Sequence, residues 1–211
     1  NVSVKLSALD SRFDPIDPEG TTERVGHRLR TLLRRARQNR AHVHVDMESY
    51  QTKDLALAIF RQIMAEDEFR DWADVGIVIQ AYLKDAETDL KKLAEWARRR
   101  GTPVWVRLVK GAYWDSEIKR AQERGLDTYP VYTRKAATDV SYLACARRLF
   151  VAGAAFYPQF ATHNAHTLAA IVELGGARTD WEFQRLHGMG EALYAQFVGT
   201  EPPGRPCRIY A

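Results

Sequence analysis

Two positively charged residues interrupt and follow an apolar stretch in VWVRLVKGAYWD, residues 104–115. The valines and leucine of 104–109 are typical of a buried β-strand, yet Arg107 lies within it and Lys110 directly follows it. Burying a positive charge costs free energy unless an anion or an electron-rich ligand lies beside it. We therefore expect the end of this strand to direct Arg107 and Lys110 at such a ligand.

Other apolar stretches also end in polar residues: Lys5, Asp46, Gln80, Thr162 with His163, His187 and Tyr210. No nucleophile with an adjacent base is evident, since Ser7 and Ser49 lack a catalytic-serine motif and neither cysteine has a histidine nearby in sequence. Cations beside an amide and aromatic groups instead favour an organic cofactor that becomes anionic, such as a reduced flavin. Gly111 would let the backbone approach this ligand, and Arg134 would pair with a pyrophosphate.

A metal site fits this set of residues less well. The six histidines include His163 and His166, three residues apart, and His44, which shares a strand face with Asp46. A metal would need histidine or carboxylate ligands from several strand ends, where Lys5 and the two cations of 104–115 would repel it. We expect no metal, and we expect His42 and His44 to pack in the core or behind the site.

Several of these residues also have purely structural interpretations. Asp46 stands too far before the helix near residue 52 to cap it, but Arg107 could be the other half of a buried ion pair with Asp46. Gln80 could cap a loop, and Lys5 could face solvent on an edge strand. Loop or rim packing is the structural interpretation of three aromatic residues: Tyr113, Trp114 and Tyr210.

Strands and helices alternate along the whole chain. The predicted strands are 2–6, 42–46, 75–80, 104–109, 157–162, 182–187 and 207–210, and the predicted helices are 21–38, 53–65, 86–99, 116–124, 132–150, 165–174 and 190–198. Helical spacing puts Leu55, Ile59 and Ile63 on one face, and Val140, Leu143 and Ala144 on another. Asn164 is a candidate helix cap, the pair 175–176 a helix end, and 201–206 a loop.

This alternation predicts an α/β protein with a parallel sheet. An open doubly wound sheet would carry a glycine fingerprint after its first strand, and VKLSALDSRFD has none. In a (β/α)₈ barrel the polar strand ends would converge on one face, so we favour a TIM-like barrel. The chain starts on a strand and ends one residue after Tyr210. We therefore expect an internal segment of a longer chain, with 1–211 as one domain lacking the barrel's first strand and last helix.

Composition narrows the class of protein. The 211 residues carry 31 Lys and Arg against 27 Asp and Glu, a net charge of +4 that is too small to indicate nucleic-acid binding. The basic run from Arg30 to Arg40 has helical spacing and favours a solvated helix face over a polyanion site. Two cysteines and no apolar run of membrane-spanning length favour a reduced, cytosolic protein. Attachment to a membrane surface through another segment stays open.

Eight motifs together resemble one family: VKLSAL, VHVDMES, VIQAYLKD, VRLVKGAYWDSEIKRAQ, YPVYTRKAATDVSYLACA, YPQFATHNAHT, EFQRLHGMGE and RPCRIYA. They resemble, in order and over nearly the whole chain, the proline dehydrogenase domain of bifunctional proline utilization A flavoenzymes. The long motif that begins at Val106 is the most specific of them. The resemblance implies a distorted (β/α)₈ barrel that binds FAD noncovalently.

The resemblance also implies a role for individual residues. Arg107 would lie near flavin N5 with Asp46 as its active-site partner, Lys5 would meet the proline carboxylate, and Tyr210 would pack against the proline ring. Ala112 and Leu186 would shape the substrate pocket. The residues implied to line FAD are Met47, Gln80, Arg107, Val109, Lys110, Gly111, Ala112, Trp114, Arg134, Thr162, His163, Asn164 and Leu186.

The implied reaction is the oxidation of L-proline to Δ1-pyrroline-5-carboxylate, the first step of proline catabolism to glutamate. A hydride would pass to flavin N5, and a membrane quinone would then reoxidise the flavin. The implied partners are an aldehyde dehydrogenase domain of the same polypeptide and the quinone, without nucleic-acid contact by this segment. The implied location is cytoplasmic or peripheral at the inner membrane.

Two elements of the family pattern lie outside residues 1–211: a first strand with a YDMLGEA-like motif and a last helix with paired arginines. We expect the isolated segment to bind proline weakly or not at all, because Lys5 alone would hold the carboxylate. Two other interpretations stay open. One is a lyase or aldolase that forms a Schiff base on Lys5 or Lys110, and the other is a polyanion-binding surface on the helix that contains Arg30 to Arg40.

Overall fold

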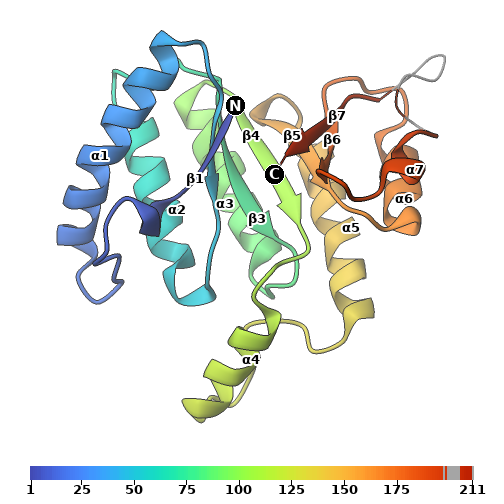
Figure 1. Cartoon of the computed structure of the whole chain (residues 1–211), viewed down its shortest axis with the longest axis horizontal. Coiled ribbons are helices and arrows are strands. Elements are labelled where there is room, and N and C mark those ends of the chain that lie inside the picture. The colour runs from blue at the N-terminus through green and yellow to red at the C-terminus, as the bar shows by residue number, and fades with distance from the viewer. Residues whose placement is uncertain (197, 199–204, 211) are drawn as a thin grey trace.

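The computed structural model describes residues 1–196, 198 and 205–210. One parallel sheet contains β1 (Val2–Lys5), β2 (Val43–Asp46), β3 (Val75–Gln80), β4 (Val104–Val109), β5 (Phe156–Ala161), β6 (Glu182–Leu186) and β7 (Cys207–Tyr210), in that order. The α-helices, labelled in Figure 1, are α1 (Pro18–Gln38), α2 (Tyr50–Met64), α3 (Ala86–Arg100), α4 (Trp114–Glu123), α5 (Lys135–Ala152), α6 (Ala165–Gly175) and α7 (Glu191–Tyr194). Short 3₁₀ turns occupy Leu6–Ala8 and Gly153–Ala155.

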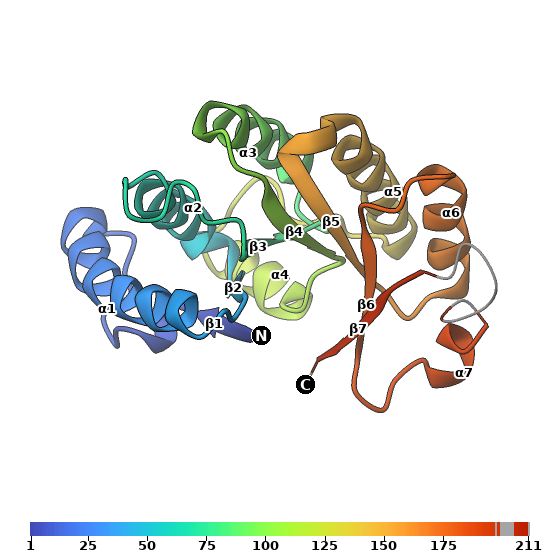
Figure 2. The same ribbon diagram turned by 90° about the horizontal axis from the view of Figure 1, so that it is seen from above.

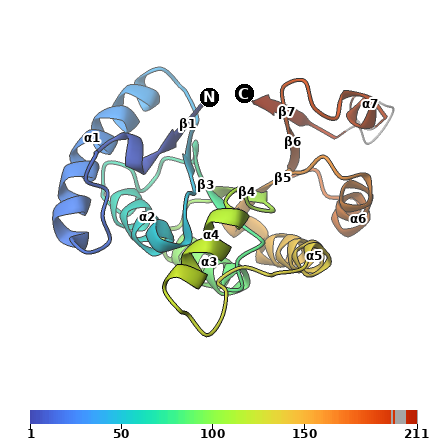
Figure 3. The same cartoon turned by 60° about the horizontal axis from the view of Figure 1, so that its bottom comes forward.

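The order of the strands identifies a barrel architecture. An open doubly wound sheet reverses its order at a switch point, whereas this sheet runs from β1 to β7 without a reversal. Helices α1, α2, α3, α5 and α6 form an outer arc round the strands in two views (Figure 2, Figure 3). The predicted α/β class and TIM-like barrel are therefore confirmed.

Alternation along the strands separates the interior of the barrel from the layer under the helices. All six residues of β3 are buried. Its small or polar residues Gly76, Val78 and Gln80 point into the interior, where Val78 and Gln80 line a cavity. Ile77 and Ile79 belong to the core beneath the helices, together with Leu55, Ile59 and Ile63 of α2, as the spacing of α2 predicts. A strand buried on both faces is expected in a parallel sheet.

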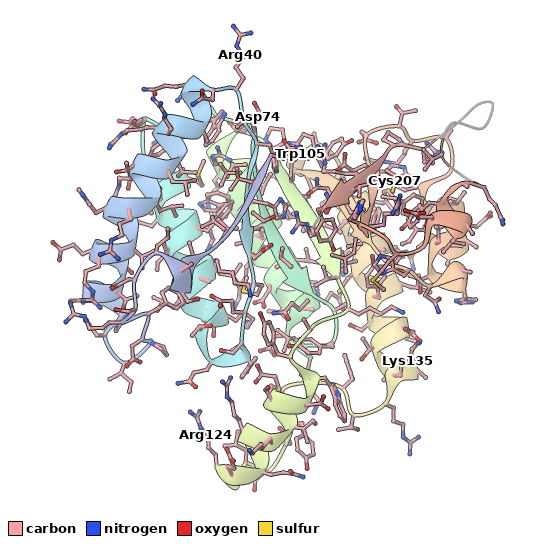
Figure 4. All side chains as sticks on the ribbon, viewed as in Figure 1. Arg40, Asp74, Trp105, Arg124, Lys135 and Cys207 are labelled. Carbon is pink, nitrogen blue, oxygen red and sulfur yellow. The ribbon has the colours of Figure 1, made fainter. Side chains whose placement is uncertain are left out.

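Aromatic side chains fill the amino end of the barrel interior. The Trp105 ring lies 4.0 Å from the Tyr157 ring and 4.7 Å from the His42 ring, measured between centroids. Gly76 leaves room for His44, because a Cβ there would lie 2.4 Å from the His44 ring. Figure 4 labels Trp105 at the end of the molecule where β4 begins. Packing of both histidines behind the site is confirmed, and no three potential metal-binding side chains cluster among the described residues.

Local sequence signals explain where the helices begin and end. The Asn164 side chain accepts a hydrogen bond from the Thr167 N–H and caps α6, and the backbone leaves that helix at Gly176 with φ +50°, as predicted. Helix α1 begins three residues earlier than predicted, because Asp17 caps it and Pro18 occupies its first turn. Helix α7 spans only four residues. Residue 197 of the predicted helix 190–198 and residues 201–204 of the predicted loop lie outside the described residues.

Helix α5 turns a different face to the core than its spacing suggested. Val140 and Ala144 lie on one side, but that side faces solvent and Val140 is 69% exposed. The core side carries Tyr142, Cys145 and Leu149. The Tyr142 hydroxyl donates to the Leu108 carbonyl at 3.1 Å. The helix carries apolar residues on all of its sides, so their spacing in the sequence could not indicate which face is buried.

The basic run on α1 pairs with acidic residues that follow α2. Arg30, Arg34 and Arg37 form ion pairs with Glu66, Glu68 and Asp71 at 2.6, 2.7 and 3.1 Å. The opposite face of α1 packs into the core through Val25, Leu29 and Leu33. This arrangement supports the solvated helix face and gives no support to a polyanion site there. No helix in the described part of the chain is long and apolar enough to cross a bilayer.

Candidate active site

The carboxyl ends of the strands surround a cavity of about 500 Å³. Figure 4 labels Lys135, at the start of α5, on this side of the sheet and opposite Trp105. All seven strands contribute to the wall, which consists of Lys5, Asp46, Met47, Val78, Gln80, Arg107, Val109, Lys110, Gly111, Ala112, Tyr113, Ala161, Thr162, His163, Asn164, Leu186 and Tyr210. Convergence of polar strand ends on one face is the feature that the sequence predicted.

Arg107 is held at each of its three side-chain nitrogens. Its Nη1 donates to the Asp46 carboxylate at 2.9 Å, its Nη2 to the Ser3 hydroxyl at 3.1 Å, and its Nε to the Gln184 amide oxygen at 2.7 Å. The guanidinium also lies 4.7 Å from the centre of the Tyr210 ring. Burial lowers the pKa of Arg107 and Asp46 opposes that effect. Arginine nevertheless stays protonated in proteins, so a fixed positive charge lies in the cavity wall.

Asp46 is the partner that the sequence suggested for this cation. Burial raises the pKa of Asp46, while Arg107 and Lys5 counteract that effect. The neighbouring loop is tied down by Gln80, whose amide nitrogen donates to the Glu48 carbonyl at 2.8 Å. Gln80 therefore lines the cavity and also holds a loop in place through this hydrogen bond. The structural interpretation of Gln80 does not exclude a place in the site.

Lys5 reaches the cavity from the first strand. A hydrogen bond with Tyr113 is the main cause of a raised pKa of Lys5. An amine that forms a Schiff base must lose its proton, which usually requires a lowered pKa. The other candidate, Lys110, forms an ion pair with Asp139. Neither environment favours the Schiff-base interpretation.

A second cavity of about 380 Å³ adjoins the first at Lys110 and Gly111. It is lined by Tyr82, Lys110, Gly111, Trp114, Tyr132, Thr133, Lys135 and Thr138. The structure gives a further reason for glycine at position 111, besides the predicted approach of the backbone to a ligand. Its φ is +135°, and a Cβ would lie 2.4 Å from the Tyr82 ring. The glycine thus permits packing against Tyr82 and an unusual backbone conformation.

The Thr162, His163 and Asn164 triplet closes the cavity beside β6. The Leu186 N–H donates to His163 Nε2 at 3.1 Å, and burial lowers the pKa of His163. The ring is therefore neutral at pH 7 and accepts through this nitrogen. The Asn164 N–H donates to the Thr162 hydroxyl at 3.2 Å. These bonds fix the loop between β5 and α6 against β6.

The protein-family model described as proline dehydrogenase matches residues 1–211 of this chain. The chain is 48% identical over 216 residues to bifunctional protein PutA of Klebsiella aerogenes, covering all of this chain and 16% of that protein. It is 30% identical over 187 residues to proline dehydrogenase 1 of Bacillus subtilis, covering 87% of this chain and 54% of that protein. The chain belongs to the proline dehydrogenase family.

Solved structures agree with this assignment. A mutant of proline utilization A from Bradyrhizobium japonicum superposes with a TM-score of 0.95 at 44% identity, covering 99% of this chain and 21% of that one. Proline utilization A from Bdellovibrio bacteriovorus, inactivated by N-propargylglycine, gives 0.94 at 42% identity, covering 100% and 22%. The chain thus spans about a sixth to a fifth of the length of these PutA relatives.

Most residues that the family resemblance singled out lie together. Lys5, Asp46, Arg107 and Tyr210 share the first cavity with nearly all the expected cofactor contacts. Trp114 lies instead in the adjoining cavity, where its indole N–H donates to the Tyr132 carbonyl at 2.9 Å. Among these residues, Arg134 lies apart, exposed at the start of α5 and outside the lining of both cavities. His187, which the sequence suggested only as a polar strand end, is exposed after β6.

Sequence reasoning missed the polar residues behind Arg107. Ser3 and Gln184 contact its guanidinium, and Glu182 contacts Gln184. A signal was present, because alternation along β6 places Glu182, Gln184 and Leu186 on one face. Three further members of the first cavity's wall are Val78, Tyr113 and Ala161. Val78 and Ala161 have side chains whose chemistry gives no indication of a site.

Proposed function

We propose that this chain is the FAD-dependent unit of a bifunctional proline-oxidising protein and converts L-proline to Δ1-pyrroline-5-carboxylate. The observation that carries the proposal is the fixed Arg107–Asp46 pair in the wall of a strand-end cavity, in a chain of the proline dehydrogenase family. The B. bacteriovorus relative adds chemical support, because N-propargylglycine has a carboxylate and a secondary amine, as proline does.

The two adjoining cavities suit an elongated cofactor. Lys110 lies where they meet, so a ligand with an anionic middle portion would pass a positive charge there. Trp114 and Tyr132 offer aromatic surface in the second cavity. FAD has a ring system at one end, a pyrophosphate in the middle and an adenine at the other. Arg107 and the other residues of the first cavity would hold its flavin portion, and Lys110 would face its phosphates.

Bound flavin supplies the two-electron acceptor for a hydride from the proline ring carbon beside nitrogen, while the nitrogen gives up a proton. Arg107 supplies the positive charge that stabilises negative charge on the reduced cofactor. Lys5 would bind the substrate carboxylate, and Tyr210 would pack on the apolar ring. A lysine is charged at neutral pH, and the pKa of Lys5 is raised and not lowered, so the amine keeps the charge that this role requires.

The function of the longer protein follows the same proposal. The relative named bifunctional protein PutA is much longer than this chain, which covers 16% of it. We propose that an aldehyde dehydrogenase domain of the same polypeptide receives the product, and that a quinone reoxidises the flavin. The protein would be cytoplasmic, with peripheral contact at the inner membrane where the quinone is found.

The visible absorption spectrum tests this function. Protein supplied with FAD should show flavin bands, and proline added without oxygen should bleach them. Because residues 1–211 alone are expected to bind proline weakly or not at all, the test uses the longer protein, in which bands that persist with proline would contradict proline oxidation. Absence of bands from folded protein given FAD would contradict cofactor binding, and borohydride trapping with a carbonyl substrate would then test the Schiff-base chemistry.

A further inference from the structure

A fully buried amide supports Arg107 from the side that faces away from the substrate cavity. Gln184 accepts from Arg107 Nε at 2.7 Å through its Oε1 and donates to Glu182 Oε1 at 3.0 Å through its Nε2. Arg107 lines the strand-end cavity and a second interior space below it, whereas Gln184 lines only the lower one of the two. Gln184 therefore reaches the proposed flavin site only through Arg107.

The orientation of the Gln184 amide is dictated by its neighbours. A carboxylate only accepts hydrogen bonds and a guanidinium only donates them. The amide nitrogen must therefore face Glu182 and the amide oxygen must face Arg107. Glu182 is itself fixed by Arg208, whose Nε and Nη2 donate to its two oxygens at 2.7 and 2.9 Å. If the amide were rotated, its nitrogen would face the N–H donor of Arg107 and its oxygen would face the carboxylate acceptor of Glu182.

The partners of Arg107 differ in how firmly their surroundings hold them. The Asp46 side chain is 26% exposed and Ser3 is exposed, whereas Gln184 is 0% exposed. Asp46 and Ser3 come from β2 and β1, and Gln184 comes from β6, so the three bonds span the barrel. A planar guanidinium bonded at all three nitrogens has one orientation in its site. The buried bond to Gln184 is the one best protected from competition by water.

We propose that Gln184, oriented by Glu182, is a positioning residue that fixes the plane of the Arg107 guanidinium for flavin reduction. The inference rests on the proposed function. Without Gln184 the guanidinium would rotate toward Asp46, and its charge would move relative to the flavin. A misplacement of about 1 Å in an active site costs up to about 10²-fold in rate. The loss would appear in kcat rather than KM, since Gln184 lies behind the substrate cavity.

A matched pair of variants tests this role in the FAD-loaded protein. Gln184→Met keeps the size of the side chain and removes the bond to Arg107. Gln159→Met is the control, because Gln159 is equally buried and donates to the same Glu182 oxygen at 2.7 Å, while its described hydrogen bond does not involve Arg107. We expect Gln184→Met to lower kcat by about 10²-fold and to lower the midpoint potential of bound FAD. Gln159→Met should lower kcat much less than Gln184→Met does, because Arg208 still donates to both oxygens of Glu182.

Three outcomes would separate the possibilities. Wild-type flavin that proline does not reduce would overturn the proposed function itself. Wild-type activity with Gln184→Met within threefold in kcat and unchanged in potential would overturn only the role of Gln184. An equal fall in both variants would also overturn it, because it would indicate general damage to the buried polar network.

If Gln184→Met does not fold, exchanging the amide and the carboxylate between positions 184 and 182 tests the role of Gln184 instead. Gln184→Glu keeps an acceptor for Arg107 but opposes the Glu182 carboxylate. Adding Glu182→Gln restores a donor next to an acceptor and leaves the net charge of the pair unchanged. We expect the single variant to lose activity and the double variant to recover at least tenfold in kcat. Failure of the double variant to exceed the single one would contradict the proposal.

Discussion

Two ion pairs with a buried cation lie in very different surroundings in this protein. Arg107–Asp46 lies in the wall of an open cavity, and its N–O distance is 2.9 Å. Lys53–Asp89 joins α2 to α3 at 2.6 Å, with both side chains less than a tenth exposed and with Asp54 as a further partner at 2.8 Å. The space beside Lys53 holds no room for a water molecule. Burial of a charge therefore marks a site only where it borders free volume.

The two pairs also differ in the shape of the cation. The Arg107 guanidinium is planar and bonded to three strands, which fixes its direction as well as its charge. Lys53 is a point charge among carboxylates, and these interactions raise its pKa against the effect of burial. We infer that Arg107 serves chemistry in the cavity and that Lys53 joins two helices. Each inference predicts a different loss when the cation is removed.

The largest effect is expected from Arg107→Met. This change removes the positive charge that would stabilise the reduced cofactor, and loss of one such group costs about 10²–10³-fold in kcat. Arg107→Lys should give an intermediate rate, because it keeps the charge but not the planar fork. Stopped-flow measurement of flavin bleaching by proline checks both variants. Arg107→Met that retains more than a tenth of the wild-type rate would remove the distinction between the two pairs.

Lys53→Met should affect stability and leave turnover unchanged. Removing one partner of a buried pair leaves Asp89 buried without its counter-ion, at a cost of about 3 kcal/mol in the free energy of unfolding. Urea unfolding measures this loss, and kcat is measured well below the melting temperature. The double variant Lys53→Met with Asp89→Leu should recover much of the stability. A fall in kcat for Lys53→Met at full folding would show that this pair also serves the site.

The sequence predicted the barrel and the polar strand ends because both depend on local patterns. Apolar alternation located β4, and Arg107 stood out in it as a charge in an apolar strand. The partner Gln184 was missed because its contact spans 77 residues and an amide in a strand has many ordinary uses. Arg134 stays a prediction: its charge suits a pyrophosphate, and the structure places it exposed at the start of α5, outside the lining of both cavities. Contacts between residues far apart in the sequence, such as Arg107 with Gln184, follow from the fold and not from local patterns.

His42, which lies below Arg107 in the barrel interior, should make the stability of the protein depend on pH. Burial lowers the pKa of His42 from 6.5 to about 4, and the positive charge of Arg208 adds to this effect. The unfolded chain therefore binds a proton at higher pH than the native protein does, so stability is lost as pH falls from about 7 toward 4. Between pH 7.5 and 5 this group should remove about 2 kcal/mol of the free energy of unfolding.

His42→Gln tests that assignment by urea unfolding at both pH values. The variant should show a smaller loss of stability between pH 7.5 and 5 than wild type, with His44 accounting for part of the remainder, because burial also lowers the pKa of His44. An unchanged pH dependence in His42→Gln would show that the acid sensitivity originates elsewhere. Measuring kcat in the same variant would show whether packing below Arg107 influences the chemistry above it.

The smallest effect is expected from Tyr210→Phe, which asks whether the ring or the hydroxyl of Tyr210 supports Arg107. The guanidinium lies over the ring at 4.7 Å from its centre, and a phenyl ring keeps the same attraction for a cation. We expect kcat to fall by less than about threefold, whereas Tyr210→Leu, which removes the aromatic face, should cost about tenfold. If both variants fell equally, the hydroxyl would be the essential group. The orientation of Arg107 would then depend on hydrogen bonds alone, and the bond from Arg107 to Gln184 would matter more for it.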